Sequence, residues 1–286
     1  MSDRRFARQV MMFGEDGQTQ IESQTVGIVG LGGLGFQVAP ALACLGVRNL
    51  GLIDDDTVDD TNLNRMPGAF VSDIGRPKTE VAREYILRIA PEAAVTAIPG
   101  NLRTREAVEF LLGCSVIFGC VDHDGPRLVL TELAAAYEIP LIDIATEIFP
   151  QHDKQPFDFG GRVVIARPGD YCLFCADQID RELATEELET PDVQALRRRH
   201  GYGLGSDIPA PAVISLNGIV ANLAVTEFLV MTTGLREPAR HLTYQGMRGV
   251  VTSRIDERDP ACFTCGYVRG QKEKTNIWRY LLPNGS

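Results

Sequence analysis

Short apolar runs alternate with amphipathic segments along the first half of the chain. Residues 25–30, TVGIVG, have the character of a buried strand, and residues 33–46 place apolar side chains at helical spacing. Further strands are predicted at 48–54, 94–99, 115–122 and 140–146, and helices at 77–91, 104–113 and 126–139. Because strands that alternate with helices form parallel sheets, we predict an α/β fold with a mostly parallel sheet and helices on both faces.

The pattern changes after residue 150. Further strands that extend the sheet, the first of them antiparallel, are predicted at 160–168, 241–246 and 249–255. Residues 176–207 are polar and weakly periodic, which predicts a mobile crossing loop with a short helix near 191–199, although a solvated charged face has the same composition. With a mixed-charge tail at about 256–286, the chain (1–286) is predicted to be one domain.

Charge and hydropathy exclude several classes of partner. The net charge of −10 disfavours binding to nucleic acids or anionic membranes, because phosphate groups would be repelled. The longest apolar run, residues 212–231, contains Asn217, Asn222 and Glu227, which are costly in lipid, so we predict a buried core helix and no membrane span. The first residues have no apolar core of a signal peptide, so we expect a cytoplasmic protein.

A glycine pattern follows the first predicted strand. Gly30, Gly32 and Gly35 spell G-x-G-x-x-G where strand passes into helix, so backbone N–H groups at the helix start face a bound phosphate. Asp54 ends the next predicted strand, where a carboxylate accepts hydrogen bonds from ribose hydroxyls. This context predicts a Rossmann-like nucleotide site, and it does not by itself choose the nucleotide.

Polar residues beyond the second strand favour a triphosphate over NAD. Asn62, Arg65 and Lys78 follow Asp54 closely, and together they supply the hydrogen bonds and positive charge that several phosphates require. An NAD site needs little more than the acidic residue, because the helix end already holds its two phosphates. Each cation taken alone is also compatible with an ordinary surface charge.

Four sequence blocks resemble one known family. IVGLGGLG, LIDDDTVDDTNLNR, IGRPK and CVDHDGPR occur in the order and spacing of the adenylating domain of the ubiquitin-activating, MoeB, ThiF and HesA superfamily. The resemblance is close over residues 4–150 and looser to about 255. It implies a Rossmann-like adenylation domain that binds ATP and Mg²⁺ through Gly30, Gly32, Gly33, Gly35, Asp54, Asp56, Asn62, Arg65, Lys78 and Asp122.

The same resemblance assigns roles to individual residues. Asp54 would bind the ribose, and Asn62, Arg65 and Lys78 would hold the phosphates. Asp122 would position magnesium for the reaction that forms the acyl phosphate. Arg127 matches a family arginine for which a packing role and a catalytic role are both open. His123 stands where the family often has Asn, and we favour a surface histidine over a substrate contact.

The start of the chain resembles a family motif that acts between subunits. RFARQ, residues 5–9, is similar to the family's R-Y-x-R-Q, in which the second arginine reaches the ATP of a partner subunit. The resemblance therefore implies a homodimer, with Arg8 joining Arg65, Lys78 and Asp122 as catalytic residues. The alternative is that Arg5 and Arg8 only decorate an N-terminal helix.

Two C-x₂-C pairs predict a metal site. Cys172 and Cys175, with Cys262 and Cys265, supply four thiolates for a closed, structural zinc site, and redox dithiols are the alternative. Many relatives in the resembled family carry such a zinc. Cys44 and Cys114 lie in segments predicted to be in the apolar core, and Cys120 ends a predicted buried strand, so none of the three is an obvious thioester nucleophile.

The resemblance implies an activity and a partner. The chain would adenylate the C-terminal glycine carboxylate of a small ubiquitin-like (β-grasp) protein and release pyrophosphate, and the acyl group would pass to a sulfur donor or to a conjugating partner's cysteine. A peptide-modifying adenylase shares the ATP site, but it usually carries an N-terminal clamp domain, for which about 20 residues before the first strand leave no room. An NAD-dependent oxidoreductase leaves Arg65, Lys78 and the cysteines unexplained, and a non-catalytic subunit would be expected to lose some of the ATP residues. The acidic stretch at 182–189 is predicted to meet a basic carrier surface or to lie in solvent.

Overall fold

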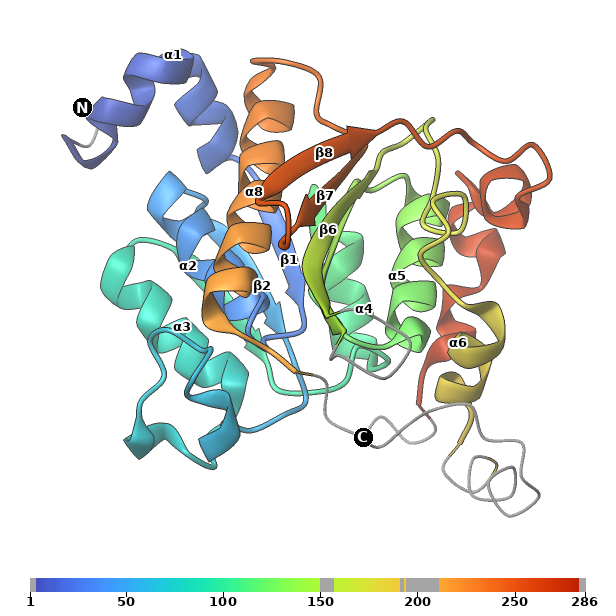
Figure 1. Cartoon of the computed structure of the whole chain (residues 1–286), viewed down its shortest axis with the longest axis horizontal. Helices are drawn as coiled ribbons and strands as arrows, with labels where there is room; N and C mark the ends of the chain where they lie inside the picture. Colours follow the sequence, from blue (N-terminus) through green and yellow to red (C-terminus); the bar gives the residue numbers. More distant parts are fainter. Residues whose placement is uncertain (1–3, 150–156, 191–192, 194–210, 283–286) are drawn as a thin grey trace.

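The computed structural model describes residues 4–149, 157–190, 193 and 211–282. Its centre is one eight-stranded sheet in the order β3-β2-β1-β4-β5-β6-β7-β8 (Figure 1). The strands are β1 (Thr25–Val29), β2 (Asn49–Ile53), β3 (Ala94–Ile98), β4 (Val116–Gly119), β5 (Leu141–Phe149), β6 (Asp158–Ala166), β7 (His241–Gln245) and β8 (Val250–Arg254). The first five strands are parallel to one another, and β6, β7 and β8 continue the sheet in antiparallel pairs that begin with β5 and β6.

Helices cover both faces of the parallel part of the sheet (Figure 1). They are α1 (Ala7–Glu22), α2 (Gly35–Leu45), α3 (Lys78–Ile89), α4 (Arg105–Leu112), α5 (Asp124–Tyr137), α6 (Arg181–Leu188) and α8 (Ile214–Thr233). Shorter helical turns are Arg4–Phe6, Asp60–Asn62, Val71–Asp73, Thr264–Val268, Lys272–Thr275 and Ile277–Tyr280. This architecture confirms the predicted fold class.

Two apolar layers sandwich the sheet because successive strand side chains point to opposite faces. Ile28 and Phe118 lie in the layer formed with α2, α3 and α8, whereas Val29 and Ile117 lie in the layer formed with α4 and α5. All of these side chains are buried. The continuous apolar character of β1 and β4, noted in the sequence, therefore reflects burial on both faces.

Helix α8 packs in the core of the protein, as predicted from the polar residues that would be costly in lipid. It is long and apolar enough by composition to cross a membrane, but 56% of its apolar window is buried inside the protein. Leu216, Val220, Ala224 and Phe228 recur every fourth residue and are all buried. Its Glu227 accepts a hydrogen bond from the Ala239 amide (2.8 Å) and pairs with Arg236, so this buried carboxylate is satisfied inside the fold.

The predicted strands and helices of residues 25–146 are all present, with ends that shift by a few residues. The crossing segment differs from expectation, because residues 181–188 form α6, which the weak periodicity did not predict. The short helix predicted near 191–199 falls, except for residue 193, outside the described residues. The tail packs back onto the domain, where Arg103 Nε donates to the Tyr280 carbonyl (2.7 Å) and the Leu282 amide donates to the Arg103 carbonyl (3.0 Å).

Candidate functional site

The glycine loop joins β1 to α2 with very close backbone contacts. A Cβ placed on Gly35 would lie 1.9 Å from the carbonyl oxygen of Gly30, so only glycine lets the helix start against the strand end. Nothing lies within 4 Å of a Cβ placed on Gly32, which leaves open space above that residue. The loop therefore presents bare backbone at the N-terminus of α2, the arrangement that binds phosphate groups.

Asp54 is fastened to the glycine loop from the end of β2. Its Oδ2 accepts from the Leu31 amide (2.5 Å) and its Oδ1 accepts from the Asp56 amide (2.9 Å). The Asp54 side chain is largely buried, and this burial raises its pKa above 3.8 despite the nearby Lys78 ammonium, which lowers it. A carboxylate is thus fixed beside the loop where the second parallel strand ends.

Lys78 supplies the positive charge next to that carboxylate. It opens α3, is 6% exposed, and its ammonium lies 2.6 Å from Asp56 Oδ2 and 3.9 Å from Asp54 Oδ1. The Lys78 amide also donates to the Asp56 carbonyl (3.0 Å), which ties the start of α3 to the end of β2. The structure therefore brings Lys78, Asp54 and Asp56 together, as the sequence predicted.

Arg65 also lies beside the glycine loop, whereas Asn62 is engaged locally. The aliphatic part of Arg65 lies 3.2 Å from the position of a Cβ on Gly33, and its Nη1 donates to the Thr61 carbonyl (2.6 Å). Asn62 Oδ1 accepts from the Asp59 amide (3.3 Å) within a short helical cap. The Arg65 guanidinium is thus bonded to its own segment while the aliphatic part lies at the loop, and the structure gives Asn62 a capping role that the sequence did not suggest.

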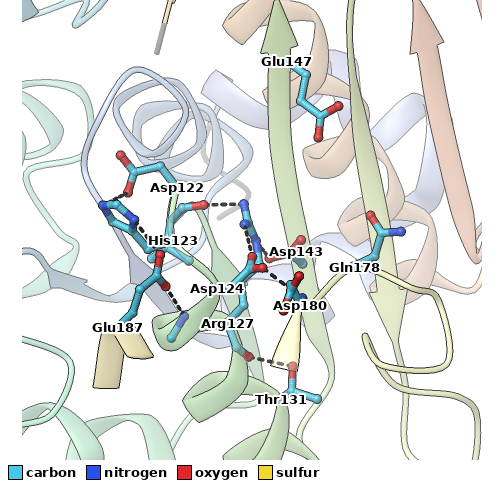
Figure 2. A network of polar contacts seen from close by, with 12 residues as sticks. Asp122, His123, Asp124, Arg127, Thr131, Asp143, Glu147, Gln178, Asp180 and Glu187 are labelled. Atoms are coloured by element: carbon cyan, nitrogen blue, oxygen red, sulfur yellow. Dashed lines mark hydrogen bonds and ion pairs between the residues drawn. The ribbon is translucent and has the colours of Figure 1, made fainter. Parts of the chain in front are cut away.

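Asp122 follows β4 and projects from its end (Figure 2). Its side chain is 90% exposed, and its Oδ1 lies 3.8 Å from Nε2 of His123. The other ring nitrogen, Nδ1, lies 3.1 Å from Glu187 Oε1, and this hydrogen bond raises the pKa of His123. His123 thus lies at the surface with an acidic partner from the crossing segment, and a contact with substrate remains untested.

Arg127 forms a buried ion-pair cluster. Its guanidinium lies 3.3 Å from Asp143 on β5 and 3.1 Å from Asp124, and it donates to the Val121 carbonyl (2.6 Å). Asp143 is fully buried and also lies 3.6 Å from Arg162. These contacts favour the packing role for Arg127 over the catalytic one, because its donors already hold the chain on either side of Asp122.

Arg8 lies exposed on α1. The neighbouring Met11 and Met12 are 87% and 63% exposed, which is unusual for large apolar side chains on one helix. The single chain does not bring Arg8 to the glycine loop through any contact among the described residues, so the predicted role in a partner's site stays a prediction.

The two cysteine pairs meet, although the chain between them is long. The sulfur atoms of Cys172, Cys175, Cys262 and Cys265 all lie within 4.8 Å of one another. Contact with Cys172 and with the Arg269 guanidinium, 3.3 Å away, lowers the pKa of Cys265 to about 5, which provides the thiolate that a metal requires. Four sulfurs at these separations fit a closed tetrahedral zinc site.

The remaining cysteines differ in exposure, and one prediction is wrong. Cys44 is exposed, although its apolar helix suggested a core position. It lies near the end of α2, on the helix side that faces away from the sheet. Cys114 and Cys120 are buried, and burial raises the pKa of Cys114 to about 12 and that of Cys120 further, so neither thiol is reactive.

Sequence reasoning missed one residue at the glycine loop. Asn217 on α8 is 2% exposed, its Oδ1 accepts from Thr146 (3.2 Å), and its Nδ2 lies 2.1 Å from the position of a Cβ on Gly33. A signal was available, because Asn217 is one of the few polar residues in this mostly apolar helix. Its placement at the loop depends on how α8 crosses α2, which the local pattern does not reveal.

The chain is similar to known adenylyltransferases over nearly its whole length. The chain is 28% identical to the molybdopterin-synthase adenylyltransferase of Escherichia coli over 92% of this chain and 96% of that protein. It is 27% identical to the sulfur carrier protein ThiS adenylyltransferase of Escherichia coli over 93% of this chain and 97% of that protein. Among solved structures, E. coli MccB with ATP has the same fold, with a TM-score of 0.70, 20% identity, and coverage of 93% of this chain and 75% of that chain.

The family assignment rests on nearly the whole chain. The sequence profile of the ThiF family matches residues 6–275, which span the glycine loop, Asp54, Lys78, Asp122 and both cysteine pairs. In the structure, the glycine loop and the three side chains lie near the carboxyl ends of the parallel strands, and the two cysteine pairs form one cluster. The chain belongs to the ThiF family.

Proposed function

We propose that this chain is an adenylyltransferase that activates the C-terminal glycine carboxylate of a small ubiquitin-like protein. ATP supplies the adenylyl group, pyrophosphate leaves, and the product is a mixed anhydride of the carrier carboxylate with AMP. The observation that carries this proposal is the convergence of the bare glycine loop, Asp54 and Lys78 in a ThiF-family chain. Named relatives with near-complete coverage are adenylyltransferases, which supports the same activity.

The site chemistry fits cleavage of a triphosphate. A carboxylate is a poor acyl donor, so activation requires an attack on the α-phosphorus and neutralisation of charge on the departing pyrophosphate. Loop N–H groups would hold the phosphates, and Lys78, which lies beside Asp54 and Asp56, would supply positive charge next to them. Arg65 at the loop rim adds a second cation. Asp54, fixed by the loop amides, is positioned to accept from the ribose.

Magnesium belongs to the same proposal. Asp122 is an exposed carboxylate beyond the end of β4, where a hard cation that prefers oxygen ligands can reach it. Asp122 would hold the ion, which would neutralise part of the negative charge of the phosphates.

The acyl group is proposed to leave for another molecule. The cysteines near the site are unsuited to a thioester, since Cys120 is buried and the four clustered cysteines fit zinc. Cys44 is exposed, but it lies at the far end of α2 from the glycine loop. We therefore propose transfer to an external sulfur donor or to a partner's cysteine, in a cytoplasmic setting.

ATP–pyrophosphate exchange tests this function. Candidate carriers are small β-grasp proteins ending in Gly-Gly that are encoded beside this gene, and a short peptide with a free C-terminus tests the alternative substrate class. The expected result is exchange with a carrier, acyl-AMP by mass spectrometry and no carrier thioester on this chain. A hydroxylamine-sensitive adduct on Cys44, Cys114 or Cys120 would contradict the transfer step.

Asp122→Ala separates chemistry from binding. Loss of the carboxylate should lower the exchange rate by about 100-fold or more while ATP affinity stays within about tenfold, because the group acts on developing charge. Asp16→Ala, on exposed α1, is the matched control. Exchange at the wild-type rate in Asp122→Ala would show that Asp122 is misassigned.

A further inference from the structure

Helix α6 is hydrogen-bonded near both of its ends to the first turn of α5, the helix that follows β4 (Figure 2). At its start, the Asp180 amide donates to Asp124 Oδ2 (2.9 Å). Near its end, Glu187 Oε2 accepts from the Gly125 amide (2.6 Å). Asp124 and Gly125 are the first residues of α5. The crossing segment therefore holds the first turn of the helix that comes directly after Asp122.

The two helices approach each other closely at Gly125. A Cβ placed on Gly125 would lie 3.1 Å from Cβ of Glu187 and 3.2 Å from Cγ of Leu188. Ala184, on the same helix, is completely buried. This packing makes α6 a fixed part of the domain, although it belongs to a segment whose sequence reads as a solvated acidic loop.

The second oxygen of Glu187 leads to Asp122 through a histidine. Glu187 Oε1 lies 3.1 Å from Nδ1 of His123, and Nε2 of the same ring lies 3.8 Å from Asp122 Oδ1. Within the described part of the chain, His123 is the side chain paired with the Asp122 carboxylate. The imidazole ring thus stands between a half-buried carboxylate and an exposed one, and Figure 2 shows the three side chains in a row.

We propose that Glu187 is a positioning residue of the adenylation site, which orients Asp122 through His123. This inference rests on the proposed function, because it takes Asp122 as the carboxylate that faces magnesium and ATP. An exposed aspartate samples several rotamers, and each unproductive rotamer removes an oxygen from the metal. A carboxylate–histidine pair restricts that motion, in the way that outer partners orient metal-binding side chains.

The proposal gives the crossing segment a role in orienting Asp122. Any movement of α6 away from α5 would release the Gly125 amide and His123 together, and Asp122 would lose its orientation. The acidic stretch 182–189 is thus divided, with Glu187 directed into the site and Glu182 exposed to solvent.

Calorimetric binding of the non-hydrolysable analogue AMPCPP, with and without Mg²⁺, tests this role without a carrier. Glu187→Gln should reduce the gain in AMPCPP affinity that Mg²⁺ provides by about tenfold, and affinity without Mg²⁺ should stay unchanged. His123→Ala should produce the same loss, although it keeps the Gly125 contact. Glu182→Gln, the same charge change on the same helix, should behave as wild type.

A double mutant identifies the route of the effect. Since Glu187 is proposed to act through Asp122, adding Glu187→Gln to Asp122→Ala should cause no further loss of the magnesium-dependent gain. An unchanged gain in Glu187→Gln, or additive losses in the double mutant, would overturn the inference while leaving the proposed function intact. If wild-type protein bound no AMPCPP at all, the proposed function would fail and this inference with it.

If Glu187→Gln lowers the melting temperature, His123→Ala decides the question. That variant leaves α6 attached through Gly125 and Asp124, so its thermal stability should match that of wild type. Loss of the magnesium-dependent gain in His123→Ala at wild-type stability supports the positioning role. Full retention of the gain in this variant overturns it.

Discussion

At the scale of single residues, two opposing effects act on the ionisation of Asp54. The Leu31 and Asp56 amides and the Lys78 ammonium favour its ionised form, whereas burial disfavours it. Burial is the larger effect, so the pKa of Asp54 is raised. The folded protein therefore carries a carboxylate that would be easier to ionise in the unfolded chain. Such a cost is typical of a group kept for binding and not for stability.

The raised pKa of Asp54 predicts the direction of a pH effect. Its contribution to the free energy of unfolding is fully present below pH 3.8, the ordinary value, and is lost as pH rises through the raised folded-state pKa. Wild-type protein should therefore lose stability relative to Asp54→Asn as pH rises from about 4 to about 7. Urea unfolding of both proteins at each pH measures this difference. A difference that moved the other way would show that the amides and Lys78 outweigh burial.

At the scale of elements, the loop between β1 and α2 separates folding from binding. Gly35 faces the Gly30 carbonyl, whereas Gly32 faces open space. Alanine at Gly35 should lower the free energy of unfolding by about 2 kcal/mol, since a backbone oxygen has no room to move. Alanine at Gly32 should leave stability within about 0.5–1 kcal/mol of wild type.

The Gly32 variant also tests whether the nucleotide binds over the glycine loop. If phosphates lie over the open backbone, Gly32→Ala should weaken AMPCPP binding by about tenfold or more while the protein remains folded. Calorimetry and thermal unfolding on the same samples separate the two effects. Wild-type AMPCPP affinity in Gly32→Ala would indicate that the nucleotide does not approach this part of the loop.

The cysteine cluster connects the end of β6 to the tail. We expect one zinc ion per chain in freshly purified protein, and Cys175→Ser should abolish it and lower the free energy of unfolding by about 2 kcal/mol or more. AMPCPP binding should persist at temperatures where the variant is folded, because none of the four cysteines contacts the glycine loop. Exposed Cys44→Ser is the matched control. Elemental analysis without zinc, or a disulfide in either pair, would contradict this prediction.

At the scale of the whole molecule, α1 presents the feature that most suggests a second copy. It lies against α8 at one side of the domain (Figure 1), with Arg8, Met11 and Met12 exposed. We expect a dimer by sedimentation, in which Arg8 of one subunit serves the ATP of the other.

A mixing experiment checks that arrangement. Arg8→Ala and Lys78→Ala should each lose pyrophosphate exchange as homodimers, whereas unfolded and refolded mixtures should regain about a quarter of wild-type activity. The reason is that half of the chains in a random mixture pair as heterodimers, and each heterodimer contains one site with both residues intact. A fully active monomer, or mixtures without activity, would contradict the role of Arg8 in a partner's site.

The amino-acid sequence by itself determined the parallel sheet and the main residues of the proposed ATP site. Alternating apolar periods specify strands and helices locally, and the carboxyl ends of neighbouring parallel strands necessarily meet. Asp54, Lys78 and the glycine loop were therefore predictable, because each lies within a few residues of such an end. The candidate metal site was equally predictable, because the C-x₂-C spacing of both cysteine pairs is itself a signal of metal binding.

Only the tertiary structure decided what reaches this site from distant parts of the chain. The contacts of Glu187 with His123 and Gly125, and of Asn217 with the glycine loop, depend on how α6 packs on α5 and α8 on α2. Composition misplaced Cys44 in the core for the same reason, because burial of a helix face depends on what covers it. Periodicity records which side chains prefer to be buried, but contacts between remote segments are set by the packing of the whole domain.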